Sequence, residues 1–232
     1  MKKIVVLTGA GMSAESGIKT FRDARGLWEG HDIMEVASPQ GWVKNKELVL
    51  EFYNIRRRQL HEVKPNAGHK ALLKLDEKYN TKIITQNVDD LHERAGSKNI
   101  IHLHGELFKV RSTGDASLVY DWKKDLNTGD KCEKGYQLRP HIVWFGEDVP
   151  LIGVAVQEVM TADIMIIIGT SMNVYPAAGL VGYLMAGSQI YYIDPKPNIS
   201  YELSRSNNLE VIAEKASTGV PKVVDKLLNE NI

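Results

Sequence analysis

The strongest constraint on the fold is a series of short apolar runs, rich in β-branched residues, with helix-forming sequence between them. Apolar strands of this kind belong to a sheet that is covered on both faces, and helices between them indicate parallel crossovers. The pattern therefore predicts an α/β fold with a Rossmann-like, doubly wound parallel sheet. The predicted strands are Ile4–Leu7, Lys82–Thr85, Ile100–Leu103, Ile164–Ile168, Ile190–Ile193 and Glu210–Ile212.

Helices are expected between these strands and after the last one. The predicted helices are Pro39–Leu60, Asn66–Lys78, Ile152–Ala162, Pro176–Ala186 and Pro221–Asn229.

Two stretches interrupt the alternation within a single domain of residues 1–232. Residues 29–81 separate the first two strands by far more than one crossover, and we expect an inserted helical subdomain there. Residues 111–139 combine glycines, many Asp and Lys residues and scattered aromatics, which predicts a second small module with weak structure of its own. The Rossmann-like core would then comprise the remaining segments, 1–28, 82–110 and 140–232.

Composition excludes several classes of protein. Lys and Arg number 29, equal to Asp and Glu, so the net charge of zero gives no support to nucleic-acid or membrane binding. The run Ile4–Leu7 is too short for a signal-peptide core, and Ile164–Gly169 cannot span a bilayer. Cys132 is the only cysteine, which rules out an internal disulfide and a multi-cysteine zinc site and fits a reducing cytoplasm.

The segment Gly9-Ala10-Gly11-Met12-Ser13-Ala14 follows the first predicted strand and has the form G-x-G-x-x-A. The glycines allow a tight turn and a close backbone approach to a pyrophosphate, which the N-terminus of a following helix would attract. The alternative is a glycine turn ahead of an ordinary helix. A dehydrogenase would place a second strand about 20 residues further on, ending in an acidic residue for the ribose, but residues 26–32 are loop-like. The sequence thus predicts a phosphate cradle without the usual dehydrogenase frame.

Polar residues follow three further strands, where open α/β sheets bind ligands. Thr85-Gln86-Asn87-Val88-Asp89-Asp90 would meet the cofactor loop, although Asn87 or Asp89 could simply cap a short helix. Gly169-Thr170-Ser171 suits a phosphate or ribose, or a capped turn. In His102-Leu103-His104-Gly105-Glu106, a metal pair of histidines is conceivable if the strand continues. The position of His104 at the edge of the crevice favours it as a general base.

Taken in chain order, these segments resemble the motifs of the sirtuin family. The resemblance comprises a first cofactor motif, a second cofactor motif, a catalytic histidine motif, a substrate-groove strand and a third cofactor segment. The matching residues are Gly9–Ile18 with Thr20–Asp23, Thr85–Asp89, His104-Gly105, Pro140–Glu147, and Gly169–Ser171 with Val174–Ala177.

The resemblance implies an NAD-dependent protein-lysine deacylase, which gives nicotinamide, O-acyl-ADP-ribose and free lysine. It implies that His104 removes a proton from a ribose hydroxyl and that Asn87 orients the ribose or a water. Mono-ADP-ribosyl transfer, NAD hydrolysis and a non-catalytic NAD sensor remain as alternatives. The residues implied to bind NAD are Gly9, Ala10, Gly11, Ser13, Ala14, Phe21, Arg22, Trp28, Gln86, Asn87, Asp89, Gly169, Thr170, Ser171, Asp194 and Ala216.

Tyr53 and Arg56 lie three residues apart on a predicted helix and therefore on one face. They resemble the Tyr-x-x-Arg pair of sirtuins that remove acidic acyl groups, since an Arg fork and a Tyr hydroxyl can bind a carboxylate. The alternative is that Arg56-Arg57-Arg58 forms a solvated basic face. The resemblance further implies that the acyl-lysine substrate contacts Val143, Phe145, Gly146 and Glu147.

The sequence departs from the family in two places. Most sirtuins hold a structural zinc with four cysteines between the histidine motif and the groove strand, whereas Arg111–Arg139 contains Cys132 alone. One thiolate cannot form such a site, so zinc is predicted to be absent. Asp194 stands where the family often has Asn near the adenosine ribose.

Overall fold

The computed structural model describes residues 1–19, 27–28 and 30–229. Six parallel strands form one sheet in the order β11-β10-β9-β1-β4-β5. The order reverses beside β1, which lies between β9 and β4, and this confirms the doubly wound parallel sheet. The strands are β1 (Lys3–Thr8), β4 (Asn80–Thr85), β5 (Ile100–His102), β9 (Ile164–Ile168), β10 (Gln189–Ile193) and β11 (Leu209–Ile212).

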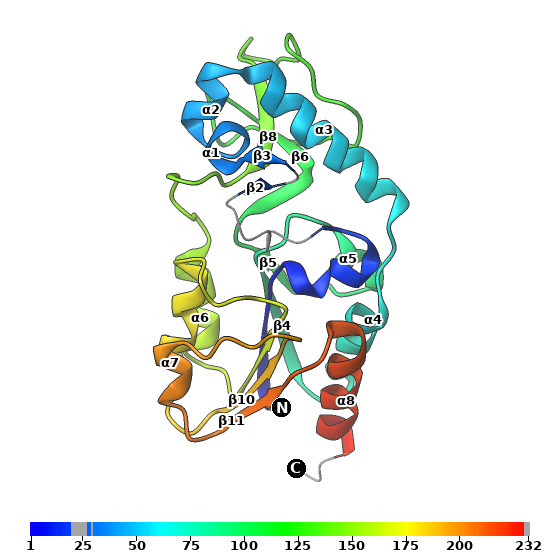
Figure 1. Cartoon of the computed structure of the whole chain (residues 1–232), viewed down its shortest axis with the longest axis vertical. Coiled ribbons are helices and arrows are strands. Elements are labelled where there is room, and N and C mark those ends of the chain that lie inside the picture. Colours follow the sequence, from blue (N-terminus) through cyan, green and yellow to red (C-terminus); the bar gives the residue numbers. More distant parts are fainter. Residues whose placement is uncertain (20–26, 29, 230–232) are drawn as a thin grey trace.

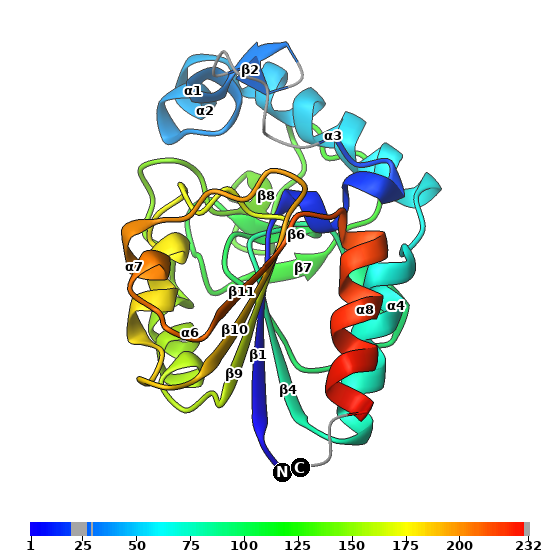
Figure 2. The same ribbon diagram turned by 60° about the horizontal axis from the view of Figure 1, so that its bottom comes forward.

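Helices cover both faces of this sheet (Figure 2). One face packs against α4 (Ala67–Leu73) and α8 (Ala216–Asn229), and the other against α6 (Ile152–Val159) and the 3-10 helix η4 (Ala177–Tyr183), with α7 (Tyr201–Ser204) beside it. Alternate residues of β1 enter the two cores, because successive side chains of a strand point to opposite faces. Apolar strands buried on both sides explain why periodicity located the sheet.

A second lobe lies beyond the carboxyl ends of these strands (Figure 1). It joins α1 (Ile33–Val36), α2 (Pro39–Lys44) and α3 (Lys46–Glu62) to a separate antiparallel sheet, β7-β6-β8. The strands of that sheet are β6 (Gly105–Ser112), β7 (Val119–Asp121) and β8 (Leu138–Ile142).

Residues 111–139 are therefore more ordered than the sequence analysis predicted, since they contain β7 and the ends of β6 and β8. Leu50 of α3 packs into one apolar cluster with residues of this module, and Trp42, Tyr120 and Trp122 pack against it. Two of the three scattered aromatics, Tyr120 and Trp122, thus pack against the core of the module, whereas Tyr136 is exposed. The buried members of the cluster are Leu50, Val110, Leu126, Cys132 and Leu138.

Side-chain caps set the boundaries of the helices around α3. The predicted single helix over 39–60 is divided at Asn45, whose side chain accepts a hydrogen bond from Leu48 N at 3.1 Å and caps α3. Asn66 caps α4 by accepting from Gly68 N at 2.9 Å. Because α4 and the following 3-10 helix η3 (Lys74–Glu77) pack on the sheet beside α8, they belong to the core rather than to the helical insertion expected over 29–81.

Three other predicted elements differ from the structure. The glycine motif leads into two 3-10 helices, η1 (Ala10–Met12) and η2 (Ala14–Ser16), rather than an α-helix, so the helix N-terminus expected there is missing from residues 10–17. The helix predicted at Pro176 is the 3-10 helix η4. α8 begins at Ala216 instead of Pro221, and Glu15 Oε2 accepts a hydrogen bond from Ser217 N in its first turn.

The expected loop over 26–32 contains a short antiparallel pair, β2 (Leu27–Trp28) with β3 (His31–Asp32).

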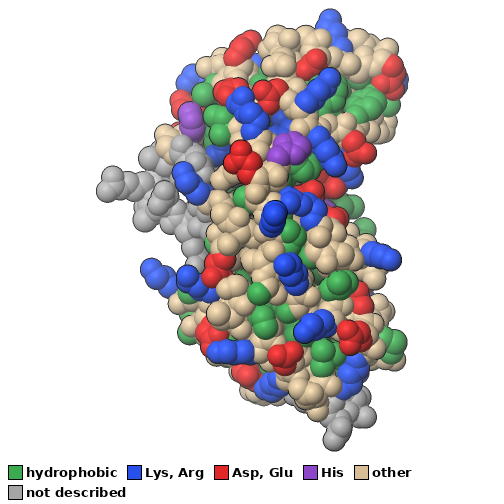
Figure 3. Space-filling model, turned by 90° about the vertical axis from the view of Figure 1, so that its right-hand side faces the viewer, with side chains coloured by type: hydrophobic (Ala, Val, Ile, Leu, Met, Phe, Trp, Pro, Cys, Tyr) green, Lys and Arg blue, Asp and Glu red, His purple; other side chains and the backbone are tan. Residues whose placement is uncertain are grey.

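On the face shown in Figure 3, Lys and Arg side chains alternate with Asp and Glu side chains over both lobes, consistent with the net charge of zero. Within the described residues, every helix is too short or too polar to cross a bilayer.

Two buried histidines, His69 of α4 and His92 of α5 (Leu91–Ala95), lie with their ring centroids 4.9 Å apart. Burial lowers the pKa of His69 to about 4 and holds the pKa of His92 well below its ordinary value. Both rings are therefore neutral in the folded protein at neutral pH.

We expect the free energy of unfolding to fall as the pH is lowered from 7 to 5. Because the folded pKa values are depressed, the unfolded chain takes up these protons first, and stability is lost as the pH falls below about 6.5. His69 alone should contribute a loss of about 2 kcal/mol over this interval. Urea unfolding at both pH values measures the change, and His69→Gln should reduce it. An unchanged pH dependence in that variant would contradict the assignment.

Candidate functional site

Two glycine-containing loops meet at the carboxyl ends of β1 and β9. Gly9 N donates to Ile168 O at 2.9 Å, and Gly11 N donates to Gly169 O at 2.8 Å. A Cβ atom on Gly9 would lie 2.8 Å from Gly169 O, and one on Gly11 would lie 2.6 Å from Gly169 Cα. Gly169 also has a φ of 61°, which favours glycine. The glycines are therefore required for the contact between the two loops.

The segment after β4 is tied to both loops by side-chain hydrogen bonds. Asn87 Nδ2 donates to Gly9 O at 3.0 Å and lies 3.2 Å from Ser13 Oγ. Ser13 Oγ donates to Asp89 Oδ2 at 2.8 Å, and Gln86 Nε2 donates to Thr170 Oγ1 at 3.2 Å. The structure thus gathers the predicted residues of three sequence segments at one edge of the sheet.

Asp89 is almost completely buried within this network. Burial raises its pKa to about 6, although the hydrogen bonds from Ser13 and from the Leu91 main chain act in the opposite direction. The carboxyl group is ionised at neutral pH and accepts two hydrogen bonds, so its role exceeds that of the simple helix cap considered from sequence.

His104 follows β5 and is held from the same segment. Its Nδ1 bonds to Gln86 O at 3.0 Å, which requires the hydrogen on Nδ1 and leaves the lone pair on Nε2. Burial lowers the pKa of His104, so the ring is neutral at neutral pH. No described residue is hydrogen-bonded to Nε2. A neutral imidazole with one anchored nitrogen and one available nitrogen has the form of a general base.

The loop after β9 is held by hydrogen bonds from residues outside the predicted motif. Tyr192 Oη donates to Thr170 O at 2.8 Å, and Asn198 Nδ2 donates to Ser171 O at 3.0 Å. Asp194, at the end of β10, is completely buried and accepts from Lys196 N at 2.8 Å. Asp194 therefore lies at the same edge of the sheet as the Thr170 loop.

Ala216 is buried at the start of α8, whose first turn contacts Glu15 through Ser217 N. The segment Ala10, Gly11 and Ala14 lies in the 3-10 turns next to this contact. Phe21 and Arg22 lie outside the described residues, and Trp28 is described only as a residue of β2.

A cleft separates α3 from the loop that carries Asp89. Arg56, Gln59 and Leu60 line it from α3, and Val88, Asp89 and Leu107 line it from the opposite side; Ile18 and Lys19 complete the lining. Arg56 Nη1 donates to Phe52 O at 2.7 Å, and its guanidinium lies 3.2 Å from the centroid of the Phe52 ring. The cleft thus connects the Arg56 guanidinium to the predicted cofactor edge.

The three consecutive arginines have different environments. Arg57 is buried and donates to Leu107 O and to Asn54 Oδ1, which makes it a structural residue. Arg58 is exposed and forms ion pairs with Glu51 and Asp125. The interpretation as a uniform solvated face therefore applies to Arg58 alone.

Tyr53 is completely buried, and its hydroxyl accepts a hydrogen bond from Trp144 Nε1 at 3.1 Å. Burial raises the pKa of Tyr53, so the hydroxyl stays protonated and retains one hydrogen to donate. The neighbouring charges include Arg56 and Arg139. Tyr53 is therefore a buried residue of the second lobe within electrostatic range of Arg56.

The segment after β8 contains the predicted substrate residues in two environments. Val143 N donates to His104 O at 2.9 Å, and Phe145 and Gly146 are exposed. Glu147 instead binds Arg139 at 2.6 Å and Arg111 at 3.1 Å, and these ion pairs hold its pKa low against the effect of burial. Glu147 therefore stabilises the module through ion pairs, whereas Val143, Phe145 and Gly146 are partly or fully exposed.

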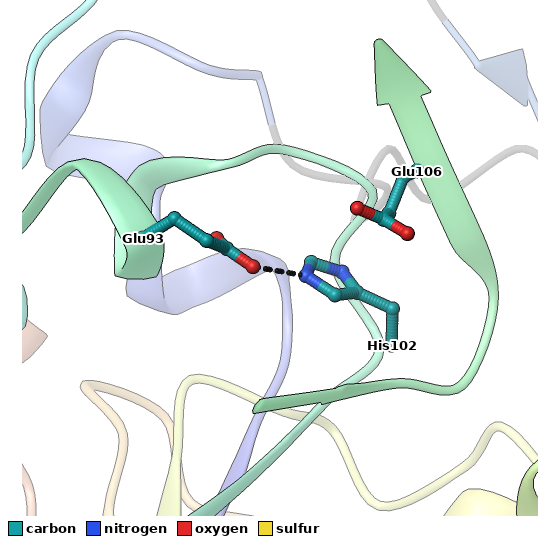
Figure 4. A group of neighbouring side chains, drawn as sticks. All are labelled: Glu93, His102 and Glu106. Carbon is teal, nitrogen blue, oxygen red and sulfur yellow. Dashed lines mark hydrogen bonds and ion pairs between the residues drawn. The ribbon is translucent and has the colours of Figure 1, made fainter. Parts of the chain in front are cut away.

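His102, Glu93 and Glu106 form a compact group beside the histidine motif (Figure 4). Their nitrogen and carboxylate atoms lie within 4.8 Å of one another. His102 Nε2 is bonded to Glu93 Oε1 at 2.7 Å, and Lys109 Nζ is bonded to Glu106 Oε2 at 2.8 Å. We therefore interpret the group as an ion-pair network. The conceivable His102–His104 pair is not formed, because β5 ends at His102 and each ring bonds to a different carbonyl.

The family model described as Sir2 family matches residues 9–176, which is more than half of the chain. The chain belongs to the Sir2 family. An NAD-dependent protein deacylase of Helicobacter pylori (strain ATCC 700392 / 26695) is 59% identical over 228 residues, covering 98% of each chain. A protein of the same name from Bacteroides thetaiotaomicron is 53% identical over 234 residues, covering 98% of this sirtuin and 99% of that protein.

Solved sirtuin structures agree with this assignment. A mutant Sir2 homologue in complex with ADP-ribose superposes with a TM-score of 0.88 at 38% identity, covering 100% of this sirtuin and 95% of that chain. A Sir2 homologue in complex with NAD gives a TM-score of 0.87 at 39% identity, covering 98% and 90%. A Sir2 protein bound to an acetylated peptide gives 0.81 at 27% identity, covering 98% and 94%.

Sequence reasoning missed a buried polar network behind the site of this sirtuin. Thr8 Oγ1 donates to Thr85 Oγ1 at 2.8 Å and lies 3.1 Å from His92 Nε2. Thr85 Oγ1 also accepts from Asn87 N at 3.0 Å. The available signal was a threonine at the end of each of two apolar strands, because a buried hydroxyl requires a partner.

Proposed function

We propose that this sirtuin removes acyl groups from protein lysines with NAD as co-substrate, and that it prefers acidic acyl groups such as succinyl and malonyl. As a Sir2-family enzyme it is an NAD-dependent protein deacylase. The observation that carries the proposal is the hydrogen bond from His104 Nδ1 to Gln86 O, which leaves Nε2 available beside the segment whose Asn87 side chain bonds to Gly9 O. Acyl-lysine proteins are the proposed partners and the cytoplasm the proposed location.

The residues at the carboxyl edge fit NAD by their chemistry. Two glycine loops approach each other without side chains between them, so a pyrophosphate at this edge would meet main chain rather than side chains. Hydroxyl, amide and carboxylate groups suited to ribose and carboxamide surround them, from Ser13, Asn87, Asp89 and Asp194. NAD supplies an electrophilic ribose carbon when nicotinamide departs.

The protein's own groups would act in a defined order. The Asp89 network would hold the carboxamide, and Asn87 would orient the ribose from its bonds to Gly9 O and Ser13 Oγ. His104 Nε2 would accept the proton of a ribose hydroxyl, because Nδ1 already carries the hydrogen that bonds to Gln86 O. The buried site would exclude bulk water, which favours acyl transfer over hydrolysis.

The preference for acidic acyl groups rests on Arg56 and Tyr53. Arg56 lines the cleft next to Asp89, and its planar fork matches a carboxylate. The Tyr53 hydroxyl accepts from Trp144, so its remaining hydrogen is available for a second bond to the same carboxylate. We propose that an acyl-lysine bound along Val143 and Phe145 extends its distal carboxylate toward this pair.

Nicotinamide release, measured with and without acylated peptides, distinguishes the candidate activities. Release that requires an acyl peptide, with loss of the acyl mass, supports the deacylase. Release without peptide would indicate an NAD hydrolase, and mass gain on a protein would indicate an ADP-ribosyltransferase. Binding of NAD without any release would indicate a sensor. Matched acetyl, succinyl and malonyl peptides test the preference in the same assay.

We further propose that the small module folds without zinc. Support comes from its apolar cluster, in which buried Cys132 packs with Leu126 and Leu138 and its Sγ lies 3.3 Å from Ser112 Oγ. Purified protein is expected to contain far less than one zinc per chain and to keep its melting temperature in EDTA, because packing would stabilise the module. One zinc per chain, lost in EDTA together with the fold, would refute this proposal.

A further inference from the structure

The main-chain carbonyl groups of two successive residues, Gln86 and Asn87, each accept a hydrogen bond from a histidine ring. His104 Nδ1 bonds to Gln86 O at 3.0 Å, and His102 Nδ1 bonds to Asn87 O at 3.2 Å. The two rings differ at the other nitrogen, because His102 Nε2 is bonded to Glu93 Oε1 at 2.7 Å. His104 and His102 thus bond to adjacent carbonyls in the same way, but His104 keeps an available Nε2 whereas both nitrogens of His102 are bonded.

The partners of His102 require a hydrogen on both ring nitrogens. A carbonyl oxygen and a carboxylate only accept hydrogen bonds, so a neutral ring would leave one of them facing a lone pair. The His102 side chain is only 9% exposed, and Glu106 places a second carboxylate beside it (Figure 4). The ring is therefore an imidazolium that satisfies Asn87 O and Glu93 together.

The charged groups around His102 favour the imidazolium on balance. Burial lowers the pKa of His102, but the hydrogen bond and charge of Glu93, the charge of Glu106 and the Asn87 carbonyl outweigh it, so the pKa is raised. Asp89 adds a further carboxylate in the loop. His92 on α5 is kept neutral by burial, and Lys109 on β6 partly offsets Glu106.

We propose that protonated His102, held by Glu93, is a positioning residue that fixes the main chain of Asn87, and that loss of its proton sets the alkaline limit of deacylation. The inference rests on the proposed function, in which the Asn87 side chain orients the ribose. That side chain reaches Gly9 O and Ser13 Oγ, so a shift of its own carbonyl changes where the amide points. The acid side of the pH profile belongs to His104 and Asp89 instead.

Glu93→Gln tests the charge while keeping the size and hydrogen-bonding capacity of the side chain. Because an opposite charge at this distance strongly favours the imidazolium, the alkaline limb of kcat/KM for NAD should move to lower pH by about one pH unit or more. The value on the plateau should stay near that of the wild type. Glu210→Gln, which breaks an exposed ion pair with Lys226, is the matched control and should leave the profile unchanged.

Two variants at position 102 separate positioning from simple stabilisation. In His102→Asn the amide can still donate to Asn87 O but does not titrate, so part of the activity should remain and the alkaline limb due to His102 should disappear. His102→Leu removes both bonds and should lower kcat/KM at every pH. Lower melting temperatures with a wild-type pH profile in all variants would mean that His102 is merely structural, and would overturn the inference.

The titration of the His102 ring by NMR, without NAD or peptide, provides a readout that is independent of activity. The resonance should titrate above the ordinary histidine range in the wild type and at lower pH in Glu93→Gln. This result without any deacylation would overturn the proposed function but support the charge on His102. A resonance insensitive to Glu93→Gln, or one that titrates only after EDTA removes a bound metal, would overturn the inference itself.

Discussion

His104→Ala is expected to lower deacylation by about 100- to 10,000-fold, the usual loss when a general base is removed. NAD affinity should change little, because the His104 ring contacts the pocket through Gln86 O while Asn87, Ser13 and Asp89 are bonded to one another. Initial rates of peptide-dependent nicotinamide release measure deacylation, and calorimetric titration with NAD measures the affinity for NAD.

His61→Ala is a matched control for this variant. His61 is an exposed histidine of α3 whose ring bonds to Lys123 O, on the side of the small module. The control should retain close to full activity. Near-normal turnover of His104→Ala would remove the base from the mechanism, whereas loss of NAD binding would show that His104 shapes the pocket.

Arg56→Met should lower kcat/KM for succinyl-lysine by roughly 10- to 150-fold and spare acetyl-lysine. The estimate follows from a net contribution of about 1.5–3 kcal/mol for hydrogen bonds to a charged group. Methionine keeps much of the length and the contact with the Phe52 ring but cannot bind a carboxylate. Kinetics on peptides that differ only in the acyl group measure the effect.

Arg58→Met is the appropriate control, because it makes the same substitution two residues away on an exposed ion-paired side chain. It should leave both substrates unaffected. Arg56→Lys keeps the charge without the fork and should lie between the wild type and Arg56→Met on succinyl-lysine. Equal losses on both substrates in Arg56→Met would assign Arg56 a structural role and remove the acidic preference.

Tyr53→Phe should affect succinyl-lysine in the same direction as Arg56→Met but less strongly. It also leaves the buried Trp144 indole N–H without its acceptor, so some loss of stability should accompany it. The melting temperature separates the two effects. Loss of activity on acetyl- and succinyl-lysine alike would attribute the change to stability.

The central sheet was predictable because its inner strands β1 and β9 are apolar on both faces and the other strands contain short apolar runs, a pattern that can be recognised without tertiary information. The segments that follow these strands were predictable as a site, because parallel strands end at one edge of the sheet. The 3-10 turns after Gly9 were not predictable, because their geometry depends on the contact between Gly11 and Gly169. Local sequence propensity cannot predict a contact between Gly11 and Gly169, which are 158 positions apart.

The roles of charged residues were even less accessible from the sequence. Arg56, Arg57 and Arg58 are chemically identical, and only the positions of Leu107 and Asp125 assign one to the core and another to the surface. His102 and His104 differ in their hydrogen-bond partners, because only the His102 ring bonds to Glu93, which lies on α5. Glu147 was predicted to contact the substrate, and its ion pairs with Arg139 and Arg111 could not be predicted from the sequence.

The central position of β1 has a consequence for synthesis of the chain. β1 is made first, but it pairs with β4 on one side and with β9 on the other, near residues 80 and 164. The Gly9 loop can reach its partner only after Gly169 has been made and has left the ribosome. An amino-terminal fragment that ends before β9 therefore lacks both half of the sheet contacts of β1 and the wall of its own cofactor pocket. Such long-range pairing also slows folding, which makes the nascent chain dependent on protection of the apolar strand β1 until the third crossover, which leads to β9, is complete.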